Sequence, residues 1–173
     1  LANYFRSKGL THIVVSVDPT NGLDRSSDSA PLVAAGHSLT EHAIQALFRG
    51  YVVAMDTLIR PAYISVASET NLIRAAAPSS LYNAVVQVAG DAYSDIRAHD
   101  ATVNVFTTVQ VETAWGYFGG TGPYVGIDVD RTDFPFAQAI GLSSYPYLAG
   151  FTDPDSLPLD YYSRIASGTG LPE

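Results

Sequence analysis

Two glutamates that follow strand-like runs are the first candidates for chemistry in this sequence. Glu69 follows the apolar run 62–68, and Glu112 follows the β-branched run 102–111. Where parallel strands alternate with helices, the carboxyl ends of the strands form the edge at which active sites lie. A carboxyl group held in a cleft at that edge can act as a general acid. The alternative for Glu69 is a loop carboxylate that caps the next segment or pairs with Arg74.

Two carboxylates on neighbouring strand ends could flank a glycosidic oxygen, because glycoside hydrolysis needs one acid and one base or nucleophile. A separation of about 5 Å between the carboxyl groups predicts retention of configuration, and roughly 6.5 to 9.5 Å predicts inversion. One of the two could instead bind substrate while the other is catalytic. Glu69 and Glu112 are therefore the expected catalytic residues.

Aromatic residues gather after the same strands. Trp115 follows Glu112 closely, and Tyr145 and Tyr147 follow the fourth apolar run. Flat aromatic faces with polar edges suit the C–H faces of sugar rings, so these three side chains are candidates for substrate binding. The alternative is ordinary packing within the loops.

Two polar residues complete the set of candidates for substrate binding. Asp18 ends the first apolar run, and Asn71 lies two residues after Glu69. Asp18 opens the stretch Asp-Pro-Thr-Asn-Gly, which is typical of turns, so a turn role competes with a ligand role.

Alternating apolar runs and amphipathic stretches indicate strands alternating with helices. The expected strands span residues 11–17, 62–68, 102–111 and 139–144, and the expected helices span 1–9, 38–60, 78–98, 134–137 and 158–166. Such units form either a doubly wound sheet or a (β/α)8 barrel. Glycine-rich nucleotide-binding motifs are missing from the sequence, and the long polar loops follow the strands, which favours the barrel. We expect an α/β fold with about four parallel strands, a partial TIM barrel formed by one domain over residues 1–173.

Composition limits the partners. The formal net charge is -8 and the sequence has one lysine, which argues against nucleic acid and anionic membranes. The 47% hydrophobic content is enough for a sizeable core. No run of 18 apolar residues occurs, so we expect a soluble chain without membrane partners. No signal-peptide pattern is present, which leaves localisation open, with secretion compatible if a signal peptide lies outside this chain.

Metal ions and cofactors are not expected. The sequence has no cysteine, and its histidines lack the spacing of a zinc site. Asp128, Asp130 and Asp133 form an acidic cluster, but without the glycine and glutamate of an EF-hand loop. We expect a solvated loop there.

Three segments carry a resemblance to a known family. The stretch from Tyr63 to Asn71, the stretch Ile140-Gly-Leu-Ser-Ser-Tyr-Pro-Tyr147 and the stretch Thr169-Gly-Leu-Pro resemble retaining (β/α)8 glycoside hydrolases, particularly endo-β-1,4-galactanase-like and cellulase-like members. The resemblance implies that the visible strands are the third to the sixth of the barrel.

In that family the acid/base is a glutamate ending strand four, which corresponds to Glu69. The asparagine that usually precedes it is Ser68 here, so Asn71 is the candidate to supply the amide instead. The nucleophile implied by the resemblance ends strand seven, which would lie beyond Glu173.

Two functions therefore remain in view. The first is a glycoside hydrolase acting on a β-linked polysaccharide or oligosaccharide, with Glu69 as general acid/base. The second is a non-catalytic half-barrel that binds glycans or persists as a structural remnant. Under either hypothesis, two open sheet edges and an apolar inner face predict a homo-oligomer that covers them.

Overall fold

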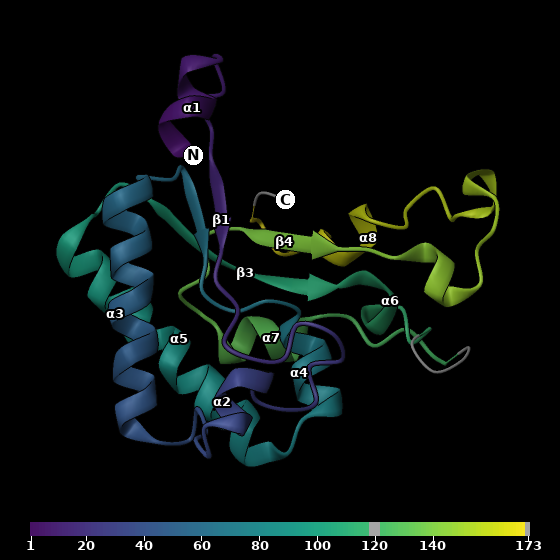
Figure 1. Cartoon of the computed structure of the whole chain (residues 1–173). Helices are drawn as coiled ribbons and strands as arrows, with labels where there is room; N and C mark the ends of the chain where they lie inside the picture. Colours follow the sequence, from purple (N-terminus) through teal and green to yellow (C-terminus); the bar gives the residue numbers. More distant parts are fainter. Residues whose placement is uncertain (118–121, 172–173) are drawn as a thin grey trace.

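A single parallel sheet organises the chain. The structure, a computed structural model, describes residues 1–117 and 122–171. Its strands are β1 (Val14–Ser16), β2 (Tyr63–Ser65), β3 (Asn104–Gln110) and β4 (Ile140–Ser143), in the spatial order β1-β2-β3-β4 (Figure 1). Every neighbouring pair is parallel. The predicted α/β class, with four parallel strands between helices, is confirmed.

Two long helices cover one face of this sheet. The helices are α1 (Ala2–Ser7), α2 (Ala30–Ala34), α3 (His42–Ile59), α4 (Thr70–Ala76), α5 (Ser79–His99), α6 (Val111–Ala114), α7 (Asp128–Asp133) and α8 (Ser163–Ala166), with 3-10 turns η1 (Pro146–Ala149) and η2 (Pro154–Ser156). Helices α3 and α5 lie side by side (Figure 1). Val52 and Val88 from these helices pack with Ile64 and Val105 from the strands in the main core. This packing fixes the sheet that positions the candidate site.

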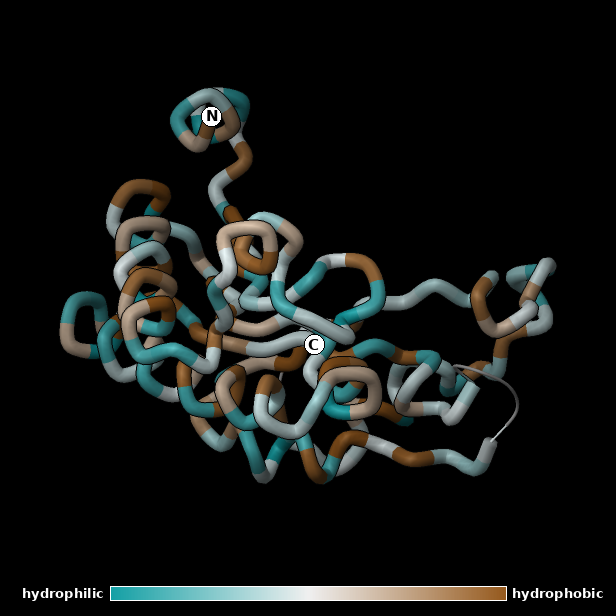
Figure 2. Tube along the Cα trace, turned by 60° about the horizontal axis from the view of Figure 1, so that its bottom comes forward, coloured by the Kyte–Doolittle hydropathy of each residue, from teal (hydrophilic) through white to brown (hydrophobic). Residues whose placement is uncertain are grey.

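A second core cluster holds the later part of the chain. Val109, Trp115, Ile127, Ile140 and Tyr161 pack together there, which joins the ends of β3 and β4 to the segment that leads into α8. Figure 1 shows the segment after β4 extending away from the sheet, and Figures 1 and 2 show α1, at the N label, standing apart from the helices that cover the sheet. In the described residues, no helix combines the length and the apolar character needed to cross a membrane.

Two helix predictions need correction. The helix expected at 134–137 lies earlier, at Asp128–Asp133, because Pro135 disfavours helical backbone at Phe134. The helix expected over 158–166 is confined to Ser163–Ala166. Helices α2, α4 and α6 were not predicted, and α4 begins directly after Glu69.

The inner face of the sheet is more polar than expected. Val15, Ile64 and Val105 face the helices, so strand alternation puts their neighbours on the other face. That face carries Val14, Ser16, Tyr63, Ser65, Asn104, Phe106, Thr108, Gln110, Gly141 and Ser143. Most of these side chains end in a hydroxyl or an amide. The prediction of an apolar inner face is therefore wrong, and Val14, Tyr63 and Phe106 are the main apolar side chains on it.

Candidate functional site

Glu69 lies in the short connection beyond the carboxyl end of β2, directly before α4, in a strained backbone conformation. Its φ and ψ are 53° and 50°, the left-handed region, and its side chain is buried, with 4% of the residue exposed. The Glu69 N–H donates to Oγ1 of Thr108 at 2.8 Å, and its carbonyl accepts from the N–H groups of Leu72 and Ile73 in the first turn of α4. A left-handed conformation costs on the order of 1–3 kcal/mol in a residue with a side chain, so it persists only where surrounding contacts impose it.

Arg25 binds the Glu69 carboxylate. Its Nε donates to Oε2 of Glu69 at 2.9 Å, and its Nη1 donates to the carboxylate of Asp18. Burial alone would lower the pKa of Arg25, but Asp18 and Glu69 outweigh it and raise the pKa, so the guanidinium stays charged. Arg74, the alternative partner suggested by the sequence, pairs with Asp130 at 2.8 Å instead.

Asp18 and Glu69 are thus brought together by a third residue. Asp18 begins the turn expected from its sequence, because Oδ1 accepts from the N–H and the hydroxyl of Thr20. Its other oxygen belongs to the ion pair with Arg25. Sequence reasoning missed Arg25. The only signal in the sequence was the presence of an arginine in the long loop after the first strand. Its position does not indicate which carboxylate the arginine contacts.

Asn71 is committed to the fold. Its Nδ2 donates to the carbonyl of Gln110 at 2.8 Å, and its Oδ1 accepts from the N–H of Gln110 at 2.8 Å. The amide therefore replaces a strand neighbour at the end of β3 and locks α4 to it. The expectation that Asn71 binds substrate is corrected, since the side chain is buried and both of its polar atoms are occupied.

Glu112 also has a structural position. The residue is 0% exposed, and Oε1 accepts from the hydroxyl of Ser144 at 2.9 Å, the N–H of Tyr145 at 2.8 Å and the hydroxyl of Tyr161 at 3.0 Å. Burial and then the Glu112 carboxylate raise the pKa of Tyr161. Because Glu112 has no exposed surface and three groups already donate to its Oε1, the structure does not support the expected catalytic role and shows Glu112 anchoring the loop after β4.

Trp115 packs inside the second core cluster. It is 7% exposed, the rings of Tyr117 and Tyr161 stack on it with centroid distances of 5.6 Å each, and Nε1 donates to the carbonyl of Tyr161 at 2.9 Å. The guanidinium of Arg164 lies 4.8 Å from its centroid. The expectation that Trp115 contacts a sugar is corrected, because these neighbouring side chains already cover its ring.

Tyr145 and Tyr147 keep exposed rings. They are 39% and 69% exposed and meet edge to face with centroids 6.3 Å apart. The Glu112 carboxylate holds the Tyr145 N–H, so the buried glutamate fixes the base of this pair. Tyr162, whose hydroxyl lies 3.4 Å from Oγ of Ser144, is a further exposed aromatic beside them that sequence reasoning did not single out.

The acidic cluster is not a solvated loop. Asp130 is buried in α7, where its carboxylate accepts from Oγ1 of Thr70 at 2.8 Å and pairs with Arg74. Burial raises the pKa of Asp130, and Arg74 opposes this shift. Asp133 accepts instead from the hydroxyl of Tyr82 at 2.7 Å. In residues 1–117 and 122–171, no group of three or more His, Asp or Glu side chains could hold a metal ion.

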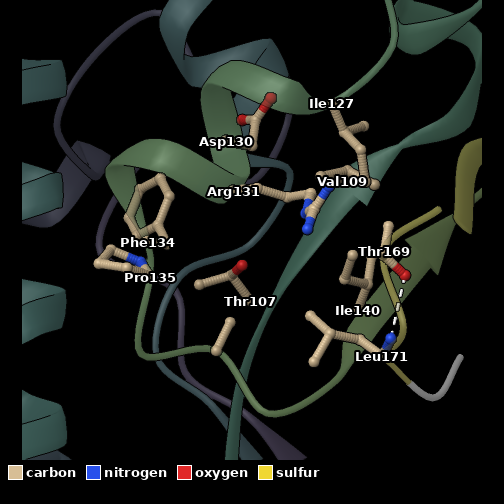
Figure 3. Close-up of a pocket in the computed structure, with 11 residues that line it drawn as sticks. Thr107, Val109, Ile127, Asp130, Arg131, Phe134, Pro135, Ile140, Thr169 and Leu171 are labelled. Carbon is tan, nitrogen blue, oxygen red and sulfur yellow. Dashed lines mark hydrogen bonds between the residues drawn. The ribbon is translucent and has the colours of Figure 1, made fainter.

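A cavity of about 240 Å³ lies between α7, β3 and β4 (Figure 3). Its walls include Val109, Phe134 and Ile140, and Arg131 extends along it. Thr107 lines the cavity, whereas the next residue, Thr108, accepts from the Glu69 N–H on the other face of β3. None of the side chains expected to bind or act on substrate lines this cavity, so it is separate from the site around Glu69.

The comparisons with known proteins give no further guide. No model of a known protein family matches the chain, and no curated protein matches it significantly. The functional interpretation therefore depends on the geometry around Glu69.

Proposed function

We propose that this protein is a glycoside hydrolase with a partial (β/α)8 barrel, acting on a β-linked polysaccharide or oligosaccharide with Glu69 as general acid/base. One observation carries the proposal. A buried, left-handed glutamate lies four residues beyond parallel strand β2, directly before α4, and is held by a buried arginine. Strained residues of this kind concentrate at active sites, and strand carboxyl ends are where barrel enzymes place them.

The two oxygens of Glu69 have different surroundings. Oε2 accepts from Arg25, while no described residue donates to Oε1. Oε1 is then the oxygen that would give a proton to the leaving glycosidic oxygen and take one from the attacking water. In the described residues, Asp18 is the other carboxylate in this hydrogen-bonded group, and Tyr145 and Tyr147 would stack against sugar rings.

The test is hydrolysis of β-1,4-galactan and β-1,4-glucan by the purified protein and its Glu69→Gln variant. The amide can still accept from Nε of Arg25 but cannot donate a carboxylic proton, so activity should fall by about 100-fold or more. Glu112→Gln is the comparison variant. Any fall in its hydrolytic activity should be no larger than its fall in stability explains. Unchanged hydrolysis by Glu69→Gln would remove the proposal.

A non-catalytic glycan-binding half-barrel is the second candidate. It is favoured by the burial of Glu112, which removes the expected second glutamate from the site. Binding of galactan or glucan oligosaccharides measured by calorimetry, with no reducing sugar released, would support this candidate. If Tyr147→Ala loses this binding, the oligosaccharide binds at the exposed tyrosines. If the protein neither binds nor hydrolyses these glycans, the remaining hypothesis is a structural remnant.

A further inference from the structure

Arg25 and Glu69 share a rare backbone conformation. Three non-glycine residues in the described ranges have positive φ, and these two, at 62° and 53°, are bonded to each other. Arg25 is buried although it lies in a loop with a polar sequence. The loop is therefore folded so that one charged side chain reaches the end of β2.

The guanidinium joins two carboxylates at once. Nε lies 2.9 Å from Oε2 of Glu69, and Nη1 contacts Asp18 and, at 3.4 Å, the carbonyl of Asn21. The planar fork of an arginine can make these contacts in different directions, whereas a lysine offers one ammonium nitrogen. The loop's own turn contacts, in which Asn21 donates its N–H to the carbonyl of Ser27 at 2.9 Å, hold Arg25 above Glu69.

We propose that Arg25 is a positioning residue that fixes and shields the Glu69 carboxylate, and that the loop 18–28 is a latch that closes one side of the site. Arg25 occupies Oε2 and leaves Oε1 for the substrate. Opening of the loop would expose Glu69 and release it from its orientation. The kinetic part of this inference depends on the proposed function, whereas the shielding does not.

Shielding is tested by chemical labelling without any substrate. Glu69 is treated with a water-soluble carbodiimide and glycine ethyl ester, and the modified peptide is quantified by mass spectrometry. Arg25→Met should label several-fold faster at Glu69 than the wild type, and Asp18→Asn, which frees the other end of the guanidinium, should label at an intermediate rate. Arg49→Met is the control, because Arg49 pairs with Asp95 at 2.7 and 2.8 Å between α3 and α5. It should leave the labelling of Glu69 unchanged.

Positioning is tested by kinetics on the same variants. Arg25→Met should lower kcat by about 100-fold with a smaller change in KM, as expected when a reacting group is misplaced. Arg25→Lys should restore part of kcat. If Arg25 had a purely structural role, the fall in kcat would instead follow the fall in thermal stability. Arg25→Lys would then restore no activity.

The outcomes separate the two proposals. Faster labelling in Arg25→Met together with full activity of Glu69→Gln would keep the latch and reject the acid/base role. Equal labelling of Glu69 in wild type, Arg25→Met and Asp18→Asn would overturn the latch. If Arg25→Met does not fold, the labelling of Asp18→Asn and Arg25→Lys tests the latch instead. Each of these variants keeps part of the contact between residues 18, 25 and 69.

Discussion

At the scale of single residues, Glu69 combines a strained backbone with a buried ion pair. The two features support each other, because Arg25 and Thr108 hold the side chain and the N–H in positions that the left-handed conformation requires. Removing one partner of a buried pair is more damaging than removing both, since the remaining charge is left without a partner.

We therefore expect Glu69→Ala to lower the free energy of unfolding by about 3 kcal/mol. Glu69→Gln should cost less, because its amide oxygen can still accept from Nε of Arg25. Urea unfolding of the two variants and the wild type checks this order. A loss in Glu69→Gln equal to that in Glu69→Ala would mean that the hydrogen bond contributes nothing beyond the charge.

At the scale of elements, close contact between β3 and β4 depends on Gly141. A Cβ there would lie 2.7 Å from Cγ2 of Thr108 and 2.8 Å from Cε2 of Phe106. We expect Gly141→Ala to lower the free energy of unfolding by about 1–3 kcal/mol, because the packed side chains of Thr108 and Phe106 would have to shift. Gly50→Ala is the matched control.

In α3 nothing lies within 4 Å of a Cβ at Gly50, so Gly50→Ala should stabilise the protein by up to about 1 kcal/mol. Both variants are measured by urea unfolding. A neutral Gly141→Ala would show that the sheet accommodates the methyl group by a small shift.

Helices α4 and α7 are joined through Asp130. Burial raises the pKa of this carboxyl above its ordinary value of 3.8, so the folded protein holds the proton more tightly than the unfolded chain does. The contribution of Asp130 to stability should then be greatest below that value and should fall as the pH rises through the raised pKa.

Asp130→Asn removes this titration. We expect the difference in unfolding free energy between wild type and variant to shift in favour of the wild type as the pH falls from 7 toward about 4. Urea unfolding at a series of pH values measures it. A difference that stays constant with pH would show that Asp130 has the same proton affinity in both states.

At the scale of the whole molecule, the sheet ends in two edge strands in the described residues, β1 and β4. Val14 on β1 is 60% exposed. Such edges pair readily with other chains, so we expect self-association. The expectation now depends on the open edges, because the inner face is largely polar.

Light scattering at micromolar concentration should show a dimer or a larger species. Val14→Lys should reduce it, because a charged side chain on an edge strand opposes pairing. Val33→Lys, at an exposed site in α2, is the control and should have no effect. A monomeric wild type would contradict the expectation.

The sequence could predict those features that local patterns determine. Apolar runs, two of them rich in β-branched residues, located all four strands, and helical periodicity located α3 and α5. Contacts between distant residues could not be predicted, since nothing near Arg25 indicates that it meets Glu69, 44 residues away. The pattern also does not say which side a residue faces, which is why Glu112, Asn71 and Trp115 were expected at the site although they belong to the core.

The ion pair between Arg25 and Glu69 has a consequence for the order of folding. The chain between the two residues contains all of α3, and the loop that carries Arg25 is brought to Glu69 by the pairing of β1 with β2. The contact should therefore form late and be among the first to break. Reactivity at Glu69 would then be controlled by the pairing of a three-residue edge strand, well before the helical core is lost.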